Sequence, residues 1–328
     1  MVGHATIAIF SVEKDLHAHA VAHELRRRHG ATCHVVATDR LFDRGGLSWE
    51  IAVDGLSRGR LRSYDGVWFE VSCLDAVWWR RVNQPLREDD RLAGPDVRDF
   101  VQNEWRAALF GVVSDQFRGR WINRPQSDVL AGNKLYQLTA AQNAGLRVPT
   151  TLVSQEPPQV REFCRRMGGQ VAVKKLHGVP GRPLATVILT DQDLDDDETI
   201  QMCPAVYQEL VRGEQHVRAN CFGDDVHAVL IESPLFDWRR DLSVPFSPHA
   251  LGSATDAALV SLLRSLDLRM GVMDLKLTDD GDVVWLEVNP QGQFLFCQAL
   301  SGVDLIGACA AFLIQEAQSP ATNTSQSS

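Results

Sequence analysis

One stretch near the C-terminus, Gly271 to Gly292, constrains the fold and the chemistry of this chain most strongly. Its sequence, GVMDLKLTDDGDVVWLEVNPQG, predicts two antiparallel strands joined at Asp280-Gly281, because Asp and Gly tolerate the positive φ angles of a tight hairpin turn. A two-residue loop at this point places Asp274 directly opposite Glu287. Side chains alternate along a strand, so Asn289 lies on the same face as Glu287.

The two faces of this hairpin carry different chemistry. One face points toward a core and holds Met273, Leu275, Leu277, Leu286 and Val288. On the other face, two opposed carboxylates repel each other unless a cation lies between them. Carboxylate and amide oxygens are hard ligands, and Mg²⁺ takes one or two carboxylates together with nucleotide phosphates. The pattern therefore predicts a cation held by Asp274, Glu287 and Asn289, and the alternative is a surface hairpin with scattered acids.

Composition limits the classes of protein to consider. The chain has 328 residues, of which 45% are hydrophobic and 23% charged, as in a globular enzyme of two or three domains. A net charge of −9 disfavours binding to nucleic acid or to an anionic membrane. No long apolar run or signal-peptide pattern occurs, and the seven scattered cysteines form no CxxC, so we expect a cytoplasmic protein with reduced thiols.

The N-terminal part predicts a chain that starts with a βαβ unit. An apolar run at Ala5–Phe10 precedes a helical pattern at Asp15–His29 that ends at Gly30, and a second strand follows at Cys33–Ala37. The segment lacks GxGxxG and thus the fingerprint of a dinucleotide cofactor site. Three histidines of the helix could share one face as metal ligands, but an exposed first turn is the favoured interpretation; they are His17, His19 and His23.

The segment Val77–Pro85, VWWRRVNQP, allows two interpretations of its arginines. In one, the tryptophans pack in the core and Arg80 and Arg81 extend to solvent. In the other, the arginines hold a carboxylate or a phosphate. Further along, Arg98–Val113 predicts a helix whose apolar residues pack in the core.

Two lysines mark the middle of the chain. Lys134 lies in the first turn of a predicted helix at Leu135–Asn143, where the helix dipole disfavours a cation unless an anion binds beside it. Lys174 lies on a strand, VAVKKL, that leads into the loop HGVPGRP at 177–183. Six acids between Asp191 and Glu198 predict a solvated helix start, and the alternative is a docking patch for a basic partner segment.

The order of these features resembles the ATP-grasp superfamily. The resemblance covers about Asn123 to Leu313 and depends on Lys134, Lys174, YQELV, Arg218, Asp274 and LEVNPQGQ. The whole chain, including VWWRR, INRPQSDVLAGNKLYQLTAAQNAGLRVPTTLVS, VRANCFGDDVHAVLIES and DWRRD, is similar to the microviridin-type peptide maturases, the graspetide synthetases. This resemblance implies an α/β (α+β) ATP-grasp fold with three domains: an N-terminal Rossmann-like pre-ATP-grasp domain at 1–123, a small central α+β domain at 124–205, and a C-terminal antiparallel-sheet domain at 206–318. The polar, low-complexity tail at 319–328 is expected to be disordered.

The resemblance also implies residue roles. Lys134 and Lys174 would hold the phosphates of ATP, and Arg218 would bind near the γ-phosphate. Arg239 would stabilise the transferred phosphoryl group or the substrate carboxylate. Two Mg²⁺ ions would lie on the acidic hairpin face described above. The adenine hinge and a ribose ligand would come from Gln208, Glu209, Leu210, Val211 and Glu214.

Two departures from the superfamily pattern stand out. The loop HGVPGRP contains fewer glycines than the phosphate-covering loop of many relatives. His216 stands where some related ligases have an acid, which puts ribose binding at that position in doubt.

The implied activity is ATP-dependent ring closure in a ribosomal precursor peptide. An Asp or Glu side chain of the peptide is phosphorylated by ATP and then joined to a Thr or Ser hydroxyl, as an ester, or to a Lys amine, as an amide. The expected partners are that peptide and a second copy of the chain. Two alternatives remain: a ligase that joins a free amino acid or small amine to a carboxylate, and a non-catalytic ATP-binding regulatory protein.

Overall fold

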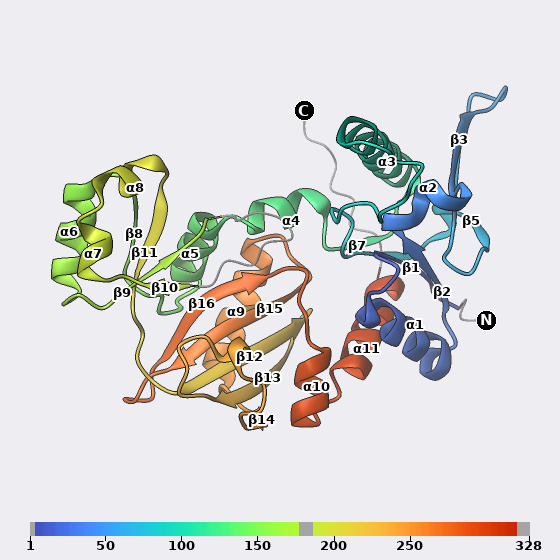
Figure 1. Ribbon diagram of the computed structural model, residues 1–328. Helices are drawn as coiled ribbons and strands as arrows, with labels where there is room; N and C mark the ends of the chain where they lie inside the picture. The colour runs from blue at the N-terminus through green and yellow to red at the C-terminus, as the bar shows by residue number, and fades with distance from the viewer. Residues whose placement is uncertain (1–3, 177–185, 320–328) are drawn as a thin grey trace. The chain divides into compact units, whose positions relative to one another are not determined.

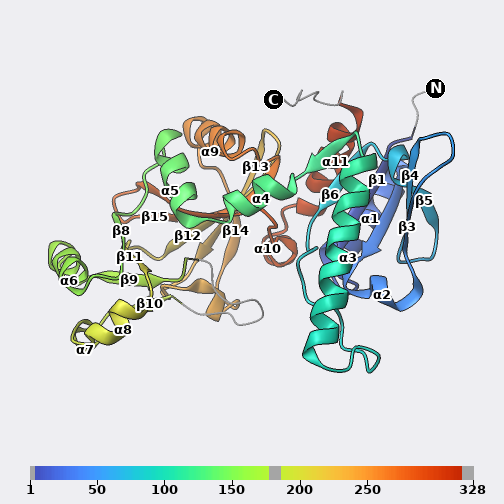
Figure 2. The same ribbon diagram turned by 90° about the horizontal axis from the view of Figure 1, so that it is seen from above.

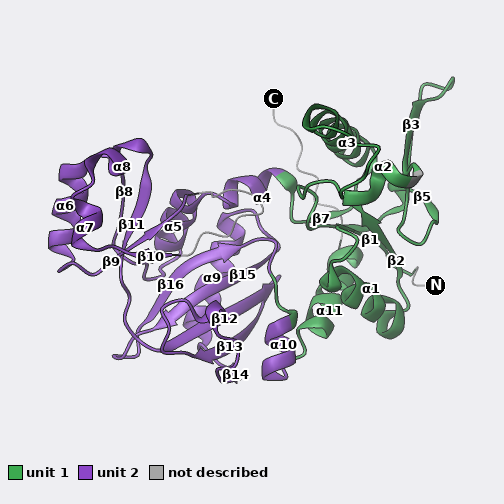
Figure 3. Cartoon of the chain, in the orientation of Figure 1, with its two compact units in different colours: residues 1–125, 293–295, 304–328 green, residues 126–292, 296–303 purple. Residues whose placement is uncertain are grey.

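The structure is a computed structural model, and it describes residues 4–176 and 186–319 (Figure 1). The chain divides into two compact units (Figure 3). Unit 1 comprises Met1–Pro125, Gln293–Leu295 and Asp304–Ser328, and unit 2 comprises Gln126–Gly292 and Phe296–Val303. The predicted loop at 177–183 and most of the predicted tail at 319–328 lie outside the described residues.

Unit 1 contains a four-stranded parallel sheet in the order β2-β1-β6-β7. Its strands are β1 (Thr6–Ser11), β2 (Thr32–Ala37), β6 (Ala76–Trp79) and β7 (Arg120–Ile122). Helices α1 (Leu16–His29) and α11 (Leu305–Gln318) pack side by side in this unit. Ala8 and Phe10 of β1 share a core with Leu109 and Val112 of α3 (Pro95–Gln116). Figure 2 shows this long helix along its length.

The caps of α1 form as their residue types predict. The side chain of Asp15 accepts a hydrogen bond from the His17 N–H, and Gly30 ends the helix in the left-handed conformation with φ of 62°. The predicted strands at 5–10 and 33–37 correspond to β1 and β2 within one residue. Local capping chemistry and apolar runs therefore suffice to locate these elements.

The rest of unit 1 departs from the prediction in two places. A second, antiparallel sheet has three strands, β3 (Leu47–Ile51), β4 (Ser57–Arg62) and β5 (Trp68–Glu70), and β4 was not predicted. Within α3, only Leu109, Val112 and Val113 are buried, and Phe100 is 66% exposed, so the expectation that its apolar residues pack in the core is wrong for its first half. The remaining short elements are η1 (Thr38–Arg40), α2 (Leu41–Arg44) and η2 (Val71–Cys73).

Unit 2 contains a small sheet in the order β10-β9-β11-β8, whose paired strands are antiparallel. The strands are β8 (Thr151–Ser154), β9 (Val171–Lys174), β10 (Val187–Ile188) and β11 (Ala205–Glu209). Helices α6 (Pro157–Arg166) and α8 (Asp197–Met202) share one core with this sheet through Phe163 and Ile200, and α7 (Asp191–Leu194) precedes α8.

The predicted acidic helix start is confirmed. Asp193 and Thr190 form a capping box on α7, Asp196 caps α8, and Asp197 pairs with Arg161.

The second sheet of unit 2 has the order β14-β13-β12-β15-β16 and is antiparallel. Its strands are β12 (Gln215–Phe222), β13 (Asp225–Glu232), β14 (Phe246–His249), β15 (Met270–Leu277) and β16 (Val283–Asn289). One face packs against α5 (Lys134–Asn143) and α9 (Ser253–Ser265), and its buried residues include Val217, Met273 and Leu275. The opposite face therefore carries Arg218, Asp274 and Lys276. The remaining elements are α4 (Pro125–Ala131), η3 (Trp238–Arg240) and α10 (Leu295–Ser301).

The hairpin β15–β16 forms the predicted pair of Asp274 with Glu287, but its loop and its register differ from the prediction. Its loop comprises Asp279, Asp280 and Gly281, since the Thr278 N–H bonds the Asp282 carbonyl at 3.0 Å and Leu277 pairs with Val283. The predicted two-residue loop is thus wrong, and this longer loop alone would set Asp274 opposite Leu286. A β-bulge then shifts the register by one residue between Leu275 and Asp274, and Asp274 pairs with Glu287 as predicted.

The bulge also changes which side chains reach the core. Trp285, not Leu286, is fully buried with Leu275 and Val288, and Leu286 is only partly buried. The expectation that Leu286 points to the core is therefore wrong. Two consecutive residues of β16, Leu286 and Glu287, oppose one residue of β15, as a bulge requires.

Candidate active site

Unit 2 contains a cavity of about 440 Å³ lined by residues of both of its sheets. The polar face of the larger sheet contributes His216, Asp274, Lys276 and Glu287, and the smaller sheet contributes Lys174 and Gln208. The lining carries more cations than carboxylates. The cations are Lys134, Lys174, Lys175, Arg239, Arg240 and Lys276, and the carboxylates are Glu209, Asp237, Asp274 and Glu287. Such a cavity suits a ligand with several negative charges.

The two opposed carboxylates of the hairpin are each paired with a cation. Arg218 Nη1 lies 2.6 Å from Asp274 Oδ1, across the β12–β15 pair. Lys134 Nζ hydrogen-bonds Glu287 Oε2, which joins the first residue of α5 to β16. Burial opposes ionisation of Glu287, but Lys134, Lys174 and Arg239 outweigh it and lower the pKa of this carboxyl. Glu287 is therefore a carboxylate at neutral pH, as a metal ligand must be.

Lys174 extends from β9 into the cavity. Its Nζ donates to Gln208 Oε1 at 2.6 Å, and Gln208 Nε2 donates to Thr151 Oγ1 at 2.9 Å. Burial lowers the pKa of Lys174 to about 8, and the nearby Lys134 and Arg239 act in the same direction, against Glu287 and Asp274. An anion bound beside this ammonium would restore its pKa, so the site favours a polyanionic ligand.

The predicted hinge begins with Gln208 and Glu209, the last two residues of β11, and continues through Leu210 and Val211 toward β12. Glu209 forms two hydrogen bonds with Thr150, which directly precedes β8. Its N–H donates to the Thr150 carbonyl, and its carboxylate accepts the Thr150 N–H at 3.0 Å. The Leu210 N–H bonds the Gln170 carbonyl. Val211 lines the cavity, whereas Leu210 and Glu214 line a second, more open hollow beside it. Glu214 is exposed there, so the structure does not bring it to the same cavity as Lys174.

The two remaining predicted site residues hold local partners. Asn289 Oδ1 accepts the N–H groups of Gln291 and Gly292 at 3.0 and 3.1 Å. These two donors engage both lone pairs of the oxygen, so binding of a cation there would displace one of them. Arg239 lines the cavity and forms a fork with Asp237, with an Nε–Oδ1 distance of 2.7 Å. The Arg239 side chain is 54% exposed, and hydrogen bonding to Asp237 raises its pKa, so the guanidinium stays charged.

Aromatic side chains surround Arg218. The guanidinium carbon lies 5.8 Å from the centroid of Trp238 and 5.6 Å from that of Phe296, and Phe246 contacts both rings. Cation–π attraction of this kind fixes the plane of an arginine. The motif DWRRD marked Trp238 only as a family feature, and Phe296 lies in no motif, so sequence reasoning missed this cage.

Sequence reasoning also missed the pair His216 and Lys276, which lie opposite each other on β12 and β15. Both are 4% exposed and both line the cavity. The alternation that placed Asp274 on the polar face would have placed Lys276 there as well. That signal is present in the sequence.

The polar motifs of unit 1 are satisfied within that unit. Arg80 is buried, and its Nε lies 2.6 Å from Asp15 Oδ2, so it holds a carboxylate of the protein itself and does not reach solvent. His17 Nε2 accepts the Phe294 and Leu295 N–H groups at 2.8 and 3.1 Å. The histidine-rich helix forms no metal cluster with other His, Cys, Asp or Glu residues among those that the structure describes.

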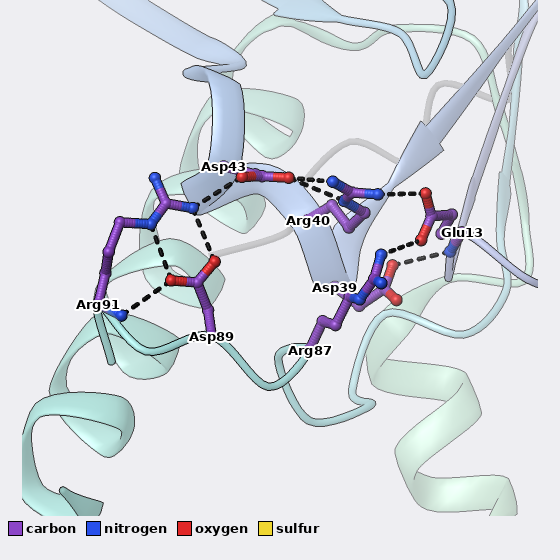
Figure 4. Close-up of polar contacts among 7 residues, drawn as sticks. All are labelled: Glu13, Asp39, Arg40, Asp43, Arg87, Asp89 and Arg91. Carbon is purple, nitrogen blue, oxygen red and sulfur yellow. Dashed lines mark hydrogen bonds and ion pairs between the residues drawn. The ribbon is translucent and has the colours of Figure 1, made fainter. Parts of the chain in front are cut away.

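A network of ion pairs covers the loops that follow β1 and β2 (Figure 4). Glu13 pairs with Arg40 and Arg87, Asp43 pairs with Arg40 and Arg91, and Arg91 also pairs with Asp89. In open parallel sheets, ligands commonly bind at the carboxyl ends of the strands, where these loops lie. Here the arginines already hold carboxylates, and the cavity of unit 2 remains the better candidate site.

No family model and no curated protein matches the chain. Solved structures do match. The macrocyclase MdnC of Microcystis aeruginosa MRC, bound with its precursor peptide MdnA, is 24% identical with a TM-score of 0.82, over 94% of this chain and 99% of that chain. A RiPP-associated ATP-grasp ligase of Chryseobacterium gregarium, with ADP and a leader and core peptide, is 19% identical with a TM-score of 0.83, over 95% and 97%.

The chain has an ATP-grasp fold. This confirms the predicted fold class: a parallel N-terminal sheet, a small antiparallel middle sheet and a C-terminal antiparallel sheet. A further ATP-grasp ligase, PsnB, complexed with minimal precursor, Mg and ADP, is 24% identical with a TM-score of 0.75, over 95% of this chain and 98% of that chain. The similarity thus spans nearly the whole chain. None of the helices within residues 4–176 and 186–319 combines the length and apolar character that a bilayer crossing needs.

Proposed function

We propose that this protein is an ATP-dependent ligase that closes rings in a ribosomal precursor peptide. The observation that carries the proposal is the cavity of unit 2, in which an opposed carboxylate pair and several cations meet within an ATP-grasp fold. The similar structures of MdnC, PsnB and the Chryseobacterium gregarium ligase, each solved with a precursor, leader or core peptide, support a peptide as the substrate.

The residues of the cavity fit a magnesium–nucleotide complex. Asp274 and Glu287 line the cavity and offer the hard oxygen ligands that Mg²⁺ prefers. Asn289, the predicted third ligand, is not among the residues that line it. Lys134 and Lys174 line the cavity and offer cations for the phosphates, whereas Arg218 lies outside that lining and pairs with Asp274. When bound, Mg²⁺ would neutralise charge on the transferred phosphoryl group.

The reaction that this arrangement supports has two steps. A side-chain carboxylate of the peptide attacks the γ-phosphorus of ATP, the bond to the bridging oxygen breaks, and ADP leaves. A hydroxyl or amine of the same peptide then attacks the acyl carbon, phosphate leaves, and the nucleophile loses its proton. Arg239, held in place by Asp237, would stabilise charge on the transferred group. Positioning and electrostatics supply the catalysis, as in other phosphoryl transfers.

Several finer points belong to the proposal. The domain boundaries at 123/124 and 205/206, a homodimer in solution and a cytoplasmic location remain predictions. The acidic segment remains a candidate surface for the leader peptide, although Asp193 and Asp196 already cap helices. Asp197 is exposed and pairs with Arg161, and the exposed acids of that segment without a capping or ion-pair role are Asp191, Asp195 and Glu198.

The decisive experiment incubates the purified protein with Mg-ATP and the short peptide encoded beside its gene. We expect the peptide to lose the mass of one water for each ring, with stoichiometric ADP and phosphate. Phosphate release with free amino acids and no change in peptide mass would instead identify a small-molecule ligase. Nucleotide binding without ADP formation on any substrate would identify a regulatory protein.

A further inference from the structure

The small sheet of unit 2 carries a row of three polar side chains on one face. Thr151 and Gln208 are direct cross-strand partners on β8 and β11, and Lys174 lies diagonally across from Gln208 on β9. Their chain neighbours Leu152 and Tyr207 pack in the core of this sheet, so alternation places the polar row on the opposite face. Long side chains at such diagonal positions can touch.

The hydroxyl of Thr151 sets the orientation of the Gln208 amide. Thr151 Oγ1 donates its single hydrogen to the Pro149 carbonyl at 2.8 Å, so toward Gln208 it can only accept. The group of Gln208 that faces it is therefore the NH₂, with an Nε2–Oγ1 distance of 2.9 Å. The amide oxygen Oε1 then lies 2.6 Å from Lys174 Nζ. A flipped amide would turn its NH₂ toward an ammonium, which is itself only a donor.

This arrangement holds Lys174 without neutralising its charge. Within residues 4–176 and 186–319, Lys174 forms no hydrogen bond or ion pair other than the bond to the uncharged amide of Gln208. An ammonium has three N–H donors, so two remain for a ligand. Lys134, by contrast, bonds the carboxylate of Glu287. Of the two lysines, Lys174 therefore keeps its full charge for an anion in the cavity.

We propose that Thr151 and Gln208 are positioning residues that aim the Lys174 ammonium at a phosphate oxygen of the nucleotide. Thr151 acts through the Gln208 amide, and the amide acts through the ammonium, so neither side chain needs to touch the ligand. The inference rests on the proposed ATP-dependent function. It extends that function to Thr151, a residue of β8 to which none of the roles described above belongs.

The first test measures ADP affinity by calorimetric titration without peptide. Thr151→Val keeps the shape of the side chain and removes the hydroxyl, and we expect it to bind ADP about fivefold more weakly than the wild type. Thr151→Ser keeps the hydroxyl and should restore nearly all of the affinity. Thr150→Val, at the exposed neighbouring threonine, is the matched control and should bind ADP as the wild type does.

A double-mutant cycle separates positioning from general damage to the fold. In the Lys174→Met background, Thr151→Val should cause no further loss of ADP affinity, because the ammonium through which Thr151 acts is absent. An equal loss in that background would overturn the proposal, and so would wild-type affinity in Thr151→Val alone.

The second test needs no nucleotide. Acetic anhydride labels lysine amines, and mass spectrometry compares the labelling of Lys174 with that of Lys175, its exposed neighbour. The hydrogen bond to Gln208 favours the ammonium over the reactive amine. Thr151→Val should therefore raise the labelling ratio of Lys174 to Lys175 at least about threefold, while Thr150→Val leaves it unchanged. An unchanged ratio in Thr151→Val would contradict the positioning role.

The two proposals fail separately. If the wild type binds no ADP, the ATP-dependent function fails, and the labelling ratio still decides whether Thr151 holds Lys174. If the peptide is modified but Thr151→Val matches the wild type in both tests, ring closure stands and this inference fails.

Discussion

Charge pairing is the main feature of the site at the scale of single residues. Asp274 and Glu287 are opposed on the hairpin, and each holds a cation from another element, Arg218 or Lys134. The repulsion between the carboxylates is therefore offset within the protein. Substituting either acid by its amide keeps the shape and removes the charge that a metal would need.

We expect Asp274→Asn and Glu287→Gln each to lower ADP formation about 10²–10³-fold, because less charge is neutralised at the transferred group. The folded state should persist, as judged by circular dichroism. Asp282→Asn, in the exposed turn of the same hairpin, serves as the control and should stay near wild-type activity. Full activity in either site variant would exclude the metal role.

Lys174 gives the site a pH dependence of known sign. Its pKa is lowered to about 8, so the nucleotide-free protein gains stability as pH rises through that value. Phosphate binding needs the ammonium, so affinity for ADP should fall between pH 7 and pH 9. In Lys174→Arg the side chain stays charged, and calorimetric titrations should show a flat profile over this range. A wild-type affinity that does not change with pH would count against Lys174 as a phosphate ligand.

At the scale of elements, the bulge in β16 decides which side chain fills the core. Trp285 is fully buried between the sheet and its helices, and Leu286 lines the cavity. A regular two-residue hairpin would exchange these two roles. The bulge is therefore testable by a pair of substitutions at adjacent positions.

Trp285→Ala should destabilise the protein by about 3–5 kcal/mol, because it opens a large void in the core. Leu286→Ala should cost far less stability and should instead weaken ADP binding. Urea unfolding monitored by circular dichroism measures the first effect, and calorimetric titration the second. Equal destabilisation by the two substitutions would mean that both side chains support the core.

At the scale of the whole molecule, residues distant in sequence are joined within unit 1. His17 of α1 accepts the N–H groups of Phe294 and Leu295, directly after the chain leaves unit 2 at Gly292. Burial lowers the pKa of His17 in spite of Asp15, so the neutral imidazole is the native form. Stability from this contact is complete above the ordinary histidine pKa and is lost as pH falls through the lowered value.

We expect His17→Phe to lower the melting temperature by several degrees at pH 7.5, because two N–H groups lose their acceptor while the ring contact with Phe294 remains. His23→Ala, on the exposed side of the same helix, should change the melting temperature by less than about 1 °C. Similar melting temperatures for wild type and His17→Phe would show that the contact adds no stability.

Features that depend on neighbours in the chain could be predicted from the sequence. The caps of α1, the cap of α5 at Asn133, the strands β1 and β2 and the polar face of β15 all follow from residue types at short spacing. Even the pairing of Asp274 with Glu287 was predicted, although the longer loop and the bulge that produce it were not.

By itself, the sequence determined the local elements and the set of charged residues that an ATP-grasp fold can use. Only the tertiary structure decided how those residues combine: Arg80 with Asp15, Lys134 with Glu287, and His216 with Lys276. The reason is physical. Capping and alternation act over a few residues, whereas these pairs join segments between 60 and 153 residues apart, whose approach is set by sheet order and core packing.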